Sequence, residues 1–277
     1  MSFNRNVAFI VCVYNGDNSV FLRESLDSIY SQKLPKCTGL KVYLHVDGDV
    51  GEDIESVIKQ YPIYKLLRSK KNVGLAKGLN KLIDSLEDEA YIFRMDSDDL
   101  CRPNRVIEQI NFMDSNGQVD FCGGSISEFI KDKSNAVTTR QYPENMARIV
   151  PTFLTSSPFA HVTICFRGDF FSKFGDYPVE FPLNEDIAYW LMSLKGGAIG
   201  ANVNKVLVDV RMDDAYSRRT TKKAYNELRV FWAVAQWQRK GYVYPVLRFL
   251  FRFLPTRVVK YVYNSKFRTL LLEKESD

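Results

Sequence analysis

An alternation of apolar runs and helical patterns in the first part of the chain constrains the fold more than any other feature. Four continuous apolar runs predict buried parallel strands, because helices cover both faces of such strands. The runs are 7–13, 41–46, 63–67 and a fourth that begins at Tyr91. Between them apolar residues recur at helical spacing, and Pro35 and Pro62 end the first two helices. The alternation predicts an α/β, doubly wound fold with a mainly parallel central sheet flanked by helices.

A polar cluster follows each predicted strand or opens the helix after it. The clusters are Tyr14-Asn15, Asp47-Gly48-Asp49, Asn72-Val73-Gly74-Leu75-Ala76 and Asp96-Ser97-Asp98-Asp99. Ligands of doubly wound sheets bind beyond the carboxyl ends of the strands, so the clusters predict one shared site. The chain has neither GxGxxG nor GxxxxGKS/T, which argues against a dinucleotide enzyme and against a phosphate-binding loop. We therefore expect a metal ion to meet the charge of any phosphate bound there.

The acidic turn at 96–99 has the pattern of a metal site. Asp96 and Asp98 form a DxD motif. Because alternate residues at a strand end point the same way, we expect both side chains to contact one ligand, while the Asp99 side chain points away from it. Oxygen ligands of this kind suit Mg²⁺ or Mn²⁺. The alternative is a solvated acidic turn that caps a helix starting near Pro103.

Beyond the acidic turn the patterns are less regular. The predicted elements are a helix at 103–113, a strand at 119–130, a weakly periodic region at 131–180, a helix that begins near Leu183 with Asn184 as its cap, and two strands at 198–203 and 206–211. The five cysteines are odd in number and include no CxxC pair, which predicts free thiols.

Taken in order, these motifs resemble the inverting family-2 glycosyltransferases with the GT-A fold, of the bacterial surface-polysaccharide type. The resemblance covers residues 6–220. The motifs that carry it are Val13-Tyr14-Asn15, Asp47, 72–76 with Asn80, Arg94-Met95-Asp96-Ser97-Asp98-Asp99, and Glu185-Asp186 with Trp190. It implies a GT-A-type nucleotide-binding catalytic domain over 1–216. Such a domain transfers a hexosyl or N-acetylhexosaminyl group from a nucleotide-diphosphate donor, here a UDP-sugar.

The resemblance also implies a donor site. Its residues are Val13, Tyr14 and Asp47 around uracil, Gly74 and Ala76 beside the nucleotide, Asp96 at the ribose, and Asn15, Asn80, Arg94 and Arg211 around the rest of the donor. Asp98, with Asp96, would bind a Mn²⁺ or Mg²⁺ ion that bridges the diphosphate. Relatives often carry a histidine after the last strand where this chain has Met212-Asp213-Asp214, so Asp213 is the implied third ligand, with Asp214 or a water molecule as the alternatives. The Asp47 loop also departs from the usual pattern, which leaves Asp49 as an alternative contact.

Glu185 and Asp186 open a predicted helix and are implied to act on the acceptor. Asp186 is the implied general base, and Glu185, about 100° away around the helix, orients neighbouring groups. Trp190 shares the face of Asp186 and is expected to wall the acceptor pocket, near His161. A helix N-terminus weakens a base, so a partly apolar pocket must offset it. The alternatives are that both acids only cap the helix and that His161, like His45, is structural.

Charge divides the chain into two parts. Residues 1–216 carry 24 Lys and Arg against 29 Asp and Glu, whereas residues 217–277 carry 14 against 4, a net charge of +10. The basic tail alternates cations with aromatic and aliphatic residues, which predicts helices that lie on an anionic membrane, with no nucleic acid expected. The alternative is that the apolar residues at 231–254 pack on the catalytic domain. Without a membrane-spanning run or a signal pattern, we expect a cytoplasmic protein, peripheral on the inner face of the cell membrane.

Two other functions would use the same features. A nucleotidyltransferase would apply the same carboxylates to a nucleoside triphosphate, and a non-catalytic module would hold a membrane through the basic tail. The Glu185-Asp186 pair beside Trp190 favours sugar transfer over nucleotidyl transfer, because a nucleotidyltransferase has no obvious task for these acids. The implied acceptor is a glycan or a polyprenyl-diphosphate-linked glycan, as in O-antigen or capsule synthesis.

Overall fold

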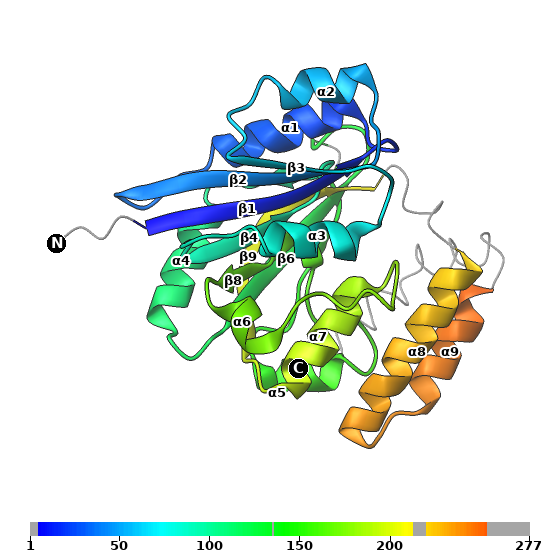
Figure 1. The fold of residues 1–277 in the computed structure, drawn as a ribbon. Coiled ribbons are helices and arrows are strands. Elements are labelled where there is room, and N and C mark those ends of the chain that lie inside the picture. The colour runs from blue at the N-terminus through cyan, green and yellow to red at the C-terminus, as the bar shows by residue number, and fades with distance from the viewer. Residues whose placement is uncertain (1–4, 135, 213–219, 254–277) are drawn as a thin grey trace.

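The computed structural model describes residues 5–134, 136–212 and 220–253. Within them a nine-stranded mixed sheet forms the centre, and helices cover both of its faces (Figure 1). The strands are β1 Arg5–Tyr14, β2 Thr38–Asp47, β3 Lys65–Ser69, β4 Tyr91–Met95, β5 Leu100–Cys101, β6 Phe121–Phe129, β7 Ala136–Arg140, β8 Cys165–Arg167 and β9 Gly200–Arg211. The helices are α1 Ser19–Tyr30, α2 Glu52–Ile58, α3 Leu75–Ile83, α4 Arg105–Ser115, α5 Met146–Thr152, α6 Phe170–Phe174, α7 Glu185–Lys195, α8 Thr221–Gln238 and α9 Val243–Arg252, with a short 3-10 helix at His161–Thr163.

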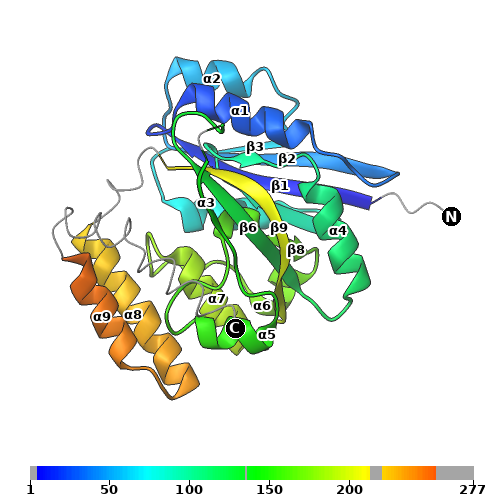
Figure 2. The ribbon, with the colours of Figure 1, turned by 180° about the vertical axis from the view of Figure 1, so that it is seen from behind.

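The strand order is β3-β2-β1-β4-β8-β6-β9-β5, and β7 pairs with the edge of β6. The first four strands of this order run parallel to one another. β8 enters antiparallel between β4 and β6, whereas β6 and β9 run parallel side by side (Figure 2). The predicted α/β fold with a mainly parallel sheet is confirmed, and its parallel half is the half that carries the polar clusters.

Strand β1 separates two hydrophobic cores, because successive strand residues point to opposite faces of the sheet. Val7, Phe9 and Val11 pack with α1, α2 and α4 on one face. Ala8 and Ile10 pack with α3, α5, α6 and α7 on the other face. With both faces covered, the polar residues that follow the parallel strands can reach solvent only at the carboxyl edge of the sheet.

The second half of the domain differs from the prediction in two details. The sequence predicted strands at 198–203 and 206–211, but β9 is one continuous strand. Asn204 and Lys205 are exposed and interrupt the apolar pattern, and the register with β6 shifts there, as a β-bulge allows without ending the strand. Helix α7 begins where predicted, but the Asn184 side chain donates to a carbonyl of α8 at 3.0 Å instead of capping α7.

Helix α8 lies next to α7, and α9 lies beside α8 on the side away from α7 (Figure 1). Helix α8 places Val230, Phe231, Val234 and Ala235 in the core on the α7 side. The expectation that Phe231, Val234 and Ala235 reach a membrane is therefore wrong, because these side chains pack on the catalytic domain. The expected boundary between 216 and 217 lies outside the described residues. No described helix combines the length and the apolar character needed to cross a membrane.

Candidate active site

The acidic turn lies at the carboxyl end of β4, a strand buried along its whole length. Asp96, Asp98 and Asp99 follow that strand where the chain leaves the core. Each offers a carboxylate oxygen, and these oxygens lie within 4.8 Å of one another. The turn is held from α1, because the Ser25 hydroxyl donates to the Asp96 carbonyl at 2.8 Å. The sequence motif thus becomes a compact group of carboxylates on a rigid strand end.

Asp99 does not turn aside as expected. Its side chain is buried, and one oxygen accepts a hydrogen bond from the Arg211 backbone N–H at 2.8 Å. Burial, together with the charges of Asp96 and Asp98, raises the pKa of Asp99 well above its usual range. Carboxylates this close repel one another, and their hard oxygens fit a divalent cation such as Mn²⁺ or Mg²⁺. The implied third ligand, Asp213, lies outside the described residues.

A further carboxylate, that of Asp17, belongs to the site although the sequence motifs did not single it out. Its side chain accepts hydrogen bonds from the Tyr14 backbone N–H at 3.0 Å and from the Ser97 hydroxyl at 2.9 Å. Burial raises the pKa of Asp17 to about 6, and the charges of Asp98 and Asp96 add to the shift. Asp17 therefore ties the loop after β1 to the acidic turn. The signal in the sequence was its place in the polar stretch that follows the first strand.

Arg211 supports the acidic turn instead of facing a diphosphate. Its Nε donates to the Asp98 carbonyl at 3.1 Å, its Nη1 to the Lys131 carbonyl at 3.2 Å and its Nη2 to Glu24 at 2.6 Å. The guanidinium also lies over the Phe21 ring, 3.7 Å from its centroid. Every guanidinium nitrogen is thus engaged within the protein, and the implied place of Arg211 around the donor is wrong.

Arg94 is buried at the end of β4 and forms an ion pair with Asp96. Its Nε and Nη1 find no hydrogen-bond partner among the described residues. Burial raises the pKa of Glu185 and of Asp186, and the charge of Arg94 opposes part of that rise. Buried donors without partners are costly, so these two nitrogens are suited to a ligand. The geometry leaves Arg94 available for the donor role that the resemblance implied.

The residues expected around the nucleotide fall into two groups. Tyr14, the last residue of β1, and Asn15 after it are exposed, and a side chain added at Gly74 would meet only open space. Val13 and Ala76 are instead buried in the two cores. The expectation that the Val13 side chain lines a uracil pocket is therefore wrong, whereas the expectation that the small Ala76 leaves room beside the nucleotide stays a prediction.

Asp47 braces the loop between β3 and α3. Its two carboxylate oxygens accept hydrogen bonds from the backbone N–H groups of Val73 at 2.8 Å and Gly74 at 2.9 Å. Gly74 has a φ of 89°, which favours glycine over any residue with a Cβ. Each Asp47 oxygen keeps a further lone pair, so the implied contact with uracil would add to this bracing.

Asn80 is a structural residue and not a donor contact. Its amide donates to the Tyr177 carbonyl at 2.9 Å, and its own carbonyl accepts from the Tyr177 N–H at 2.9 Å. The Tyr177 hydroxyl lies 2.8 Å from Nε2 of His161. Burial, together with the charge of Arg94, holds the pKa of His161 well below its usual range, which keeps the ring neutral. His161 therefore belongs to a fixed hydrogen-bonded unit beside the site.

Trp190 does not wall a pocket. Its side chain is fully buried, stacks on Phe121 with ring centroids 5.4 Å apart, and meets the His161 ring edge-on at 5.8 Å. The four-residue spacing from Asp186 indicated a shared helix face. That reasoning failed because α7 is buried on almost every side after its first turn, so a shared face does not make Trp190 accessible.

Glu185 and Asp186 form the first turn of α7, where Glu185 is 9% exposed and Asp186 is half-buried. Burial raises the pKa of both carboxyls. For Asp186, a backbone hydrogen bond at Ile187 and the charges of Lys223 and Arg94 act in the opposite direction without cancelling the effect. The surroundings thus offset the weakening that a helix N-terminus imposes on a base, as the sequence argument required.

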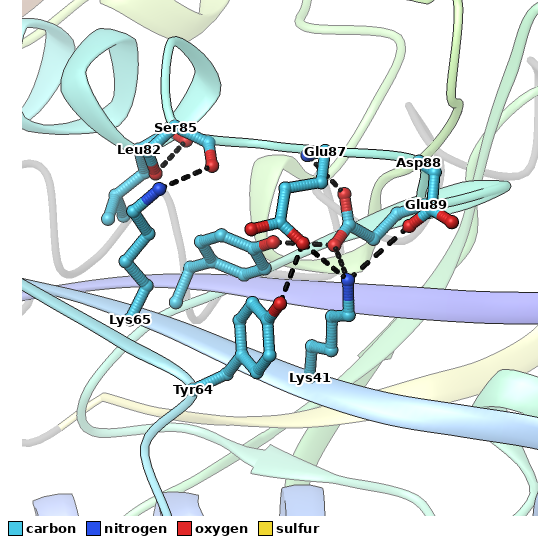
Figure 3. Close-up of polar contacts among 9 residues, drawn as sticks. Lys41, Tyr64, Lys65, Leu82, Ser85, Glu87, Asp88 and Glu89 are labelled. Carbon is cyan, nitrogen blue, oxygen red and sulfur yellow. Dashed lines mark hydrogen bonds and ion pairs between the residues drawn. The ribbon is translucent and has the colours of Figure 1, made fainter.

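A second acidic group, Glu87-Asp88-Glu89, precedes β4 at the opposite end of that strand, and its oxygens are also close enough for a metal. Lys41 already occupies its centre: Nζ lies 3.0 Å from Glu87, 3.4 Å from Asp88 and 2.9 Å from Glu89 (Figure 3). The Tyr64 hydroxyl donates to Glu87 at 2.6 Å. Because an ammonium supplies the positive charge, this group is an internal ion-pair network.

Comparison with known proteins agrees with this fold and site. Residues 8–175 match the profile of glycosyl transferase family 2. The UDP-Gal:alpha-D-GlcNAc-diphosphoundecaprenol beta-1,3-galactosyltransferase of Escherichia coli is 29% identical over 271 residues, which cover 95% of this chain and 96% of that protein.

Two solved structures share the fold. Staphylococcus aureus TarS 1-349 in complex with UDP-GlcNAc has a TM-score of 0.60 at 16% identity, over 95% of this chain and 74% of that one. Mannosyltransferase PcManGT from Pyrobaculum calidifontis, in complex with GDP-Man and Mn²⁺, has a TM-score of 0.59 at 16% identity. The match covers 87% of this chain and 66% of that one.

The central sheet, its helical layers and these structural neighbours define a GT-A-type fold. Because the family profile matches more than half of its length, the chain belongs to glycosyl transferase family 2 and is a glycosyltransferase. The family resemblance and the enzyme class read from the sequence are confirmed.

Proposed function

We propose that the enzyme moves a hexosyl or N-acetylhexosaminyl group from a UDP-sugar to a glycan or polyprenyl-diphosphate-linked acceptor, with inversion and with a divalent metal ion. The observation that carries the proposal is the division of the acids into two groups. The acidic turn at 96–99 ends β4, and Glu185-Asp186 opens α7. Arg94 pairs with Asp96 and its charge also acts on Asp186, which supports a single site between the two groups.

The first group suits the donor. Asp96 and Asp98, with Asp99 close by, would hold Mn²⁺ or Mg²⁺, which stabilises the negative charge of the leaving nucleoside diphosphate. Tyr14, Asn15 and the Gly74 loop border the open end of the sheet, where the nucleotide would lie. The free Nε and Nη1 of Arg94 then donate to donor oxygens.

The second group suits the acceptor. Asp186 takes the proton of the acceptor hydroxyl as that oxygen attacks the anomeric carbon from the face opposite the diphosphate. Direct displacement inverts the anomeric configuration and needs only one protein carboxylate at the acceptor. The Glu185 Oε2 atom is buried and finds no partner in the described parts of the chain, which supports a role for Glu185 in accepting a hydrogen bond from a neighbouring hydroxyl and orienting that hydroxyl.

The relatives support the finer parts of the proposal. The Escherichia coli protein is named for UDP-Gal and a diphosphoundecaprenol-linked sugar, and the two solved structures hold UDP-GlcNAc or GDP-Man with Mn²⁺. A lipid-linked acceptor would be met at the inner face of the cell membrane, with the enzyme bound there peripherally. We assign the product to a surface polysaccharide such as O-antigen or capsule.

Transfer from a panel of UDP- and GDP-sugars to a short-chain polyprenyl-diphosphate glycan tests the proposal. We expect product from a UDP-sugar only, loss of product on chelation and recovery with Mn²⁺ or Mg²⁺, and an inverted linkage by NMR. A retained linkage or chelator-insensitive transfer would contradict the mechanism. Pyrophosphate release from a nucleoside triphosphate would indicate a nucleotidyltransferase, and the absence of both donor binding and product would indicate a non-catalytic module.

A further inference from the structure

Helix α9 directs its charged residues inward. Arg248 Nη2 lies 2.6 Å from Glu227 Oε1, and Arg252 Nε lies 2.5 Å from Glu227 Oε2. Glu227 belongs to α8, and its side chain is only 4% exposed. Arg248 also donates to the Thr155 carbonyl at 2.5 Å, so it connects α9 with the catalytic domain. Arg248 and Arg252 are the charged residues of α9, and both face the protein.

The outer face of α9 is apolar. Its exposed side chains are Tyr242, Val243, Tyr244, Val246, Leu247, Leu250 and Phe253, each at least 40% exposed. Val243, Leu247 and Leu250 follow the i, i+4, i+7 spacing of a single stripe along the helix. An ordinary surface helix has the reverse arrangement, with apolar residues inward and charges in water. Contiguous apolar exposure of this kind marks an interaction surface.

The surroundings of this face favour a membrane as its partner. Arg239 and Lys240 are exposed in the turn that leads into α9, and residues 217–277 carry 14 Lys and Arg against 4 Asp and Glu. Trp232 of α8 is 41% exposed and meets the Tyr242 ring at 5.6 Å beside the same face. Aromatic rings of this kind settle at the lipid headgroup level, and cations next to them complement anionic headgroups.

We propose that the outer face of α9 inserts into the interfacial layer of an anionic phospholipid bilayer. This inference rests on the proposed function, because a lipid-carried acceptor requires the enzyme at a bilayer. The helix has 10 residues, about 15 Å in length, so it lies along the surface. Leu247 and Leu250 enter the acyl boundary, Trp232 and Tyr242 lie at the headgroups, and Arg239 and Lys240 contact phosphates.

This geometry changes the expected source of membrane affinity. The alternation of cations and aromatics in the sequence suggested that Arg248 and Arg252 face the headgroups. In the structure they hold α9 in position through Glu227, and the outward face is left to apolar side chains. Attachment therefore depends first on apolar burial, and charge adds a preference for anionic lipid.

Flotation with lipid vesicles tests the inference. The probes are vesicles of phosphatidylcholine alone and of phosphatidylcholine with a quarter phosphatidylglycerol. Burial of one leucine side chain contributes roughly tenfold in partitioning, so Leu247→Gln/Leu250→Gln should bind both vesicle types about 100-fold more weakly than the wild type. Arg239→Gln/Lys240→Gln should lose only the preference for anionic vesicles. Val137→Gln/Val179→Gln, which changes exposed valines of the catalytic domain, is the matched control and should bind like the wild type.

The changed leucines are exposed, so the urea midpoint should stay at the wild-type value, and Val243→Gln/Val246→Gln gives an independent variant of the same face. Wild-type binding by both α9 variants would overturn the inference. A wild-type dimer that Leu247→Gln/Leu250→Gln converts to monomer, without vesicle binding, would assign the face to a second copy instead. Transfer to a water-soluble acceptor should be equal in all variants. Vesicle binding without any transfer would refute the proposed function and leave this inference standing.

Discussion

Replacing Lys41 with methionine would remove the charge from the acidic group Glu87-Asp88-Glu89 and keep most of the apolar length of the side chain. The Lys41 side chain is 13% exposed and that of Glu89 1%, so their 2.9 Å contact is a buried ion pair. In the variant, Glu89 keeps hydrogen bonds from the Tyr43 hydroxyl at 2.5 Å and the Glu87 N–H at 2.7 Å. The substitution therefore isolates the loss of the ammonium charge.

The structure sets the expected magnitude. Removing one partner of a buried ion pair costs about 3–5 kcal/mol, because the other charge stays where water cannot solvate it. Glu87 and Asp88 are 46% and 78% exposed, so each of their contacts with Lys41 adds only about 0–1 kcal/mol. Because Glu89 keeps its other hydrogen bonds, we expect a loss of stability at the lower end of the 3–5 kcal/mol range, about 3 kcal/mol at neutral pH. For a chain of this size, that loss lowers the melting temperature by about 6 °C.

The pH dependence follows from the pKa of Glu89. Burial pushes this pKa upward, but hydrogen bonds from Tyr43 and Lys41 outweigh burial and hold it below the usual value. A depressed pKa contributes stability above the unfolded-state pKa, about 4.3 for glutamate, and that stability is lost as the pH falls through the folded-state pKa. The difference between wild type and Lys41→Met should therefore be full at neutral pH and shrink in acid.

Urea unfolding followed by tryptophan fluorescence, at neutral and acid pH, measures both effects. Lys65→Met is the matched control, because Lys65 Nζ donates to the neutral Ser85 carbonyl at 3.2 Å, and its loss should cost about 1 kcal/mol or less (Figure 3). Adding Glu89→Gln to Lys41→Met should recover much of the loss, since no buried charge remains. The reasoning would be refuted if Lys41→Met unfolded at the wild-type urea midpoint, or if the double variant unfolded at a lower urea concentration than Lys41→Met alone.

Further predictions concern the site. Asp98→Asn should abolish transfer and weaken Mn²⁺-dependent donor binding by calorimetry; unchanged metal affinity would place the metal elsewhere. Asp186→Asn should lower turnover by on the order of 10²–10⁴ with donor affinity kept, and Glu185→Gln should lose less; the opposite ranking would contradict their roles. Because burial raises the pKa of Asp186 and a base must be ionised, wild-type turnover should fall on acidification at a higher pH than an ordinary aspartate, about 3.9, would give. Gly74→Ala should cost about 1–2 kcal/mol in the urea assay, since its φ of 89° strains a residue with a Cβ; an unchanged midpoint would show that the loop adapts.

The parallel half of the fold was predictable because the sequence of each of its strands, taken by itself, indicates a strand. Runs such as 7–13 are apolar on both faces and end in polar residues, so strand, sheet position and site edge follow from one short stretch. The second half lacks such signals. β8 has only three residues, and its place between β4 and β6 depends on long-range pairing that no local period encodes.

The candidate site shows the same division. The acid motifs were found because their carboxylates directly follow an apolar run or open a predicted helix, whereas the role of Arg211 depends on Glu24, 187 residues away in the chain. Trp190 was misassigned because spacing along a helix does not tell which side faces the core. Asp17 was overlooked because its raised pKa arises from burial between two loops, which only the tertiary structure creates.

The support that Arg211 gives to the acidic turn has a consequence for synthesis on the ribosome. Its backbone N–H binds the Asp99 carboxylate from 112 residues further along the chain. A growing chain therefore carries its complete carboxylate motif long before the residue that fixes the motif has been made. The segment 8–175 that defines the family ends short of Arg211 as well. The nascent chain thus has these acids early, but the backbone N–H and guanidinium that hold them arrive only with Arg211, at the end of the last strand in the described residues.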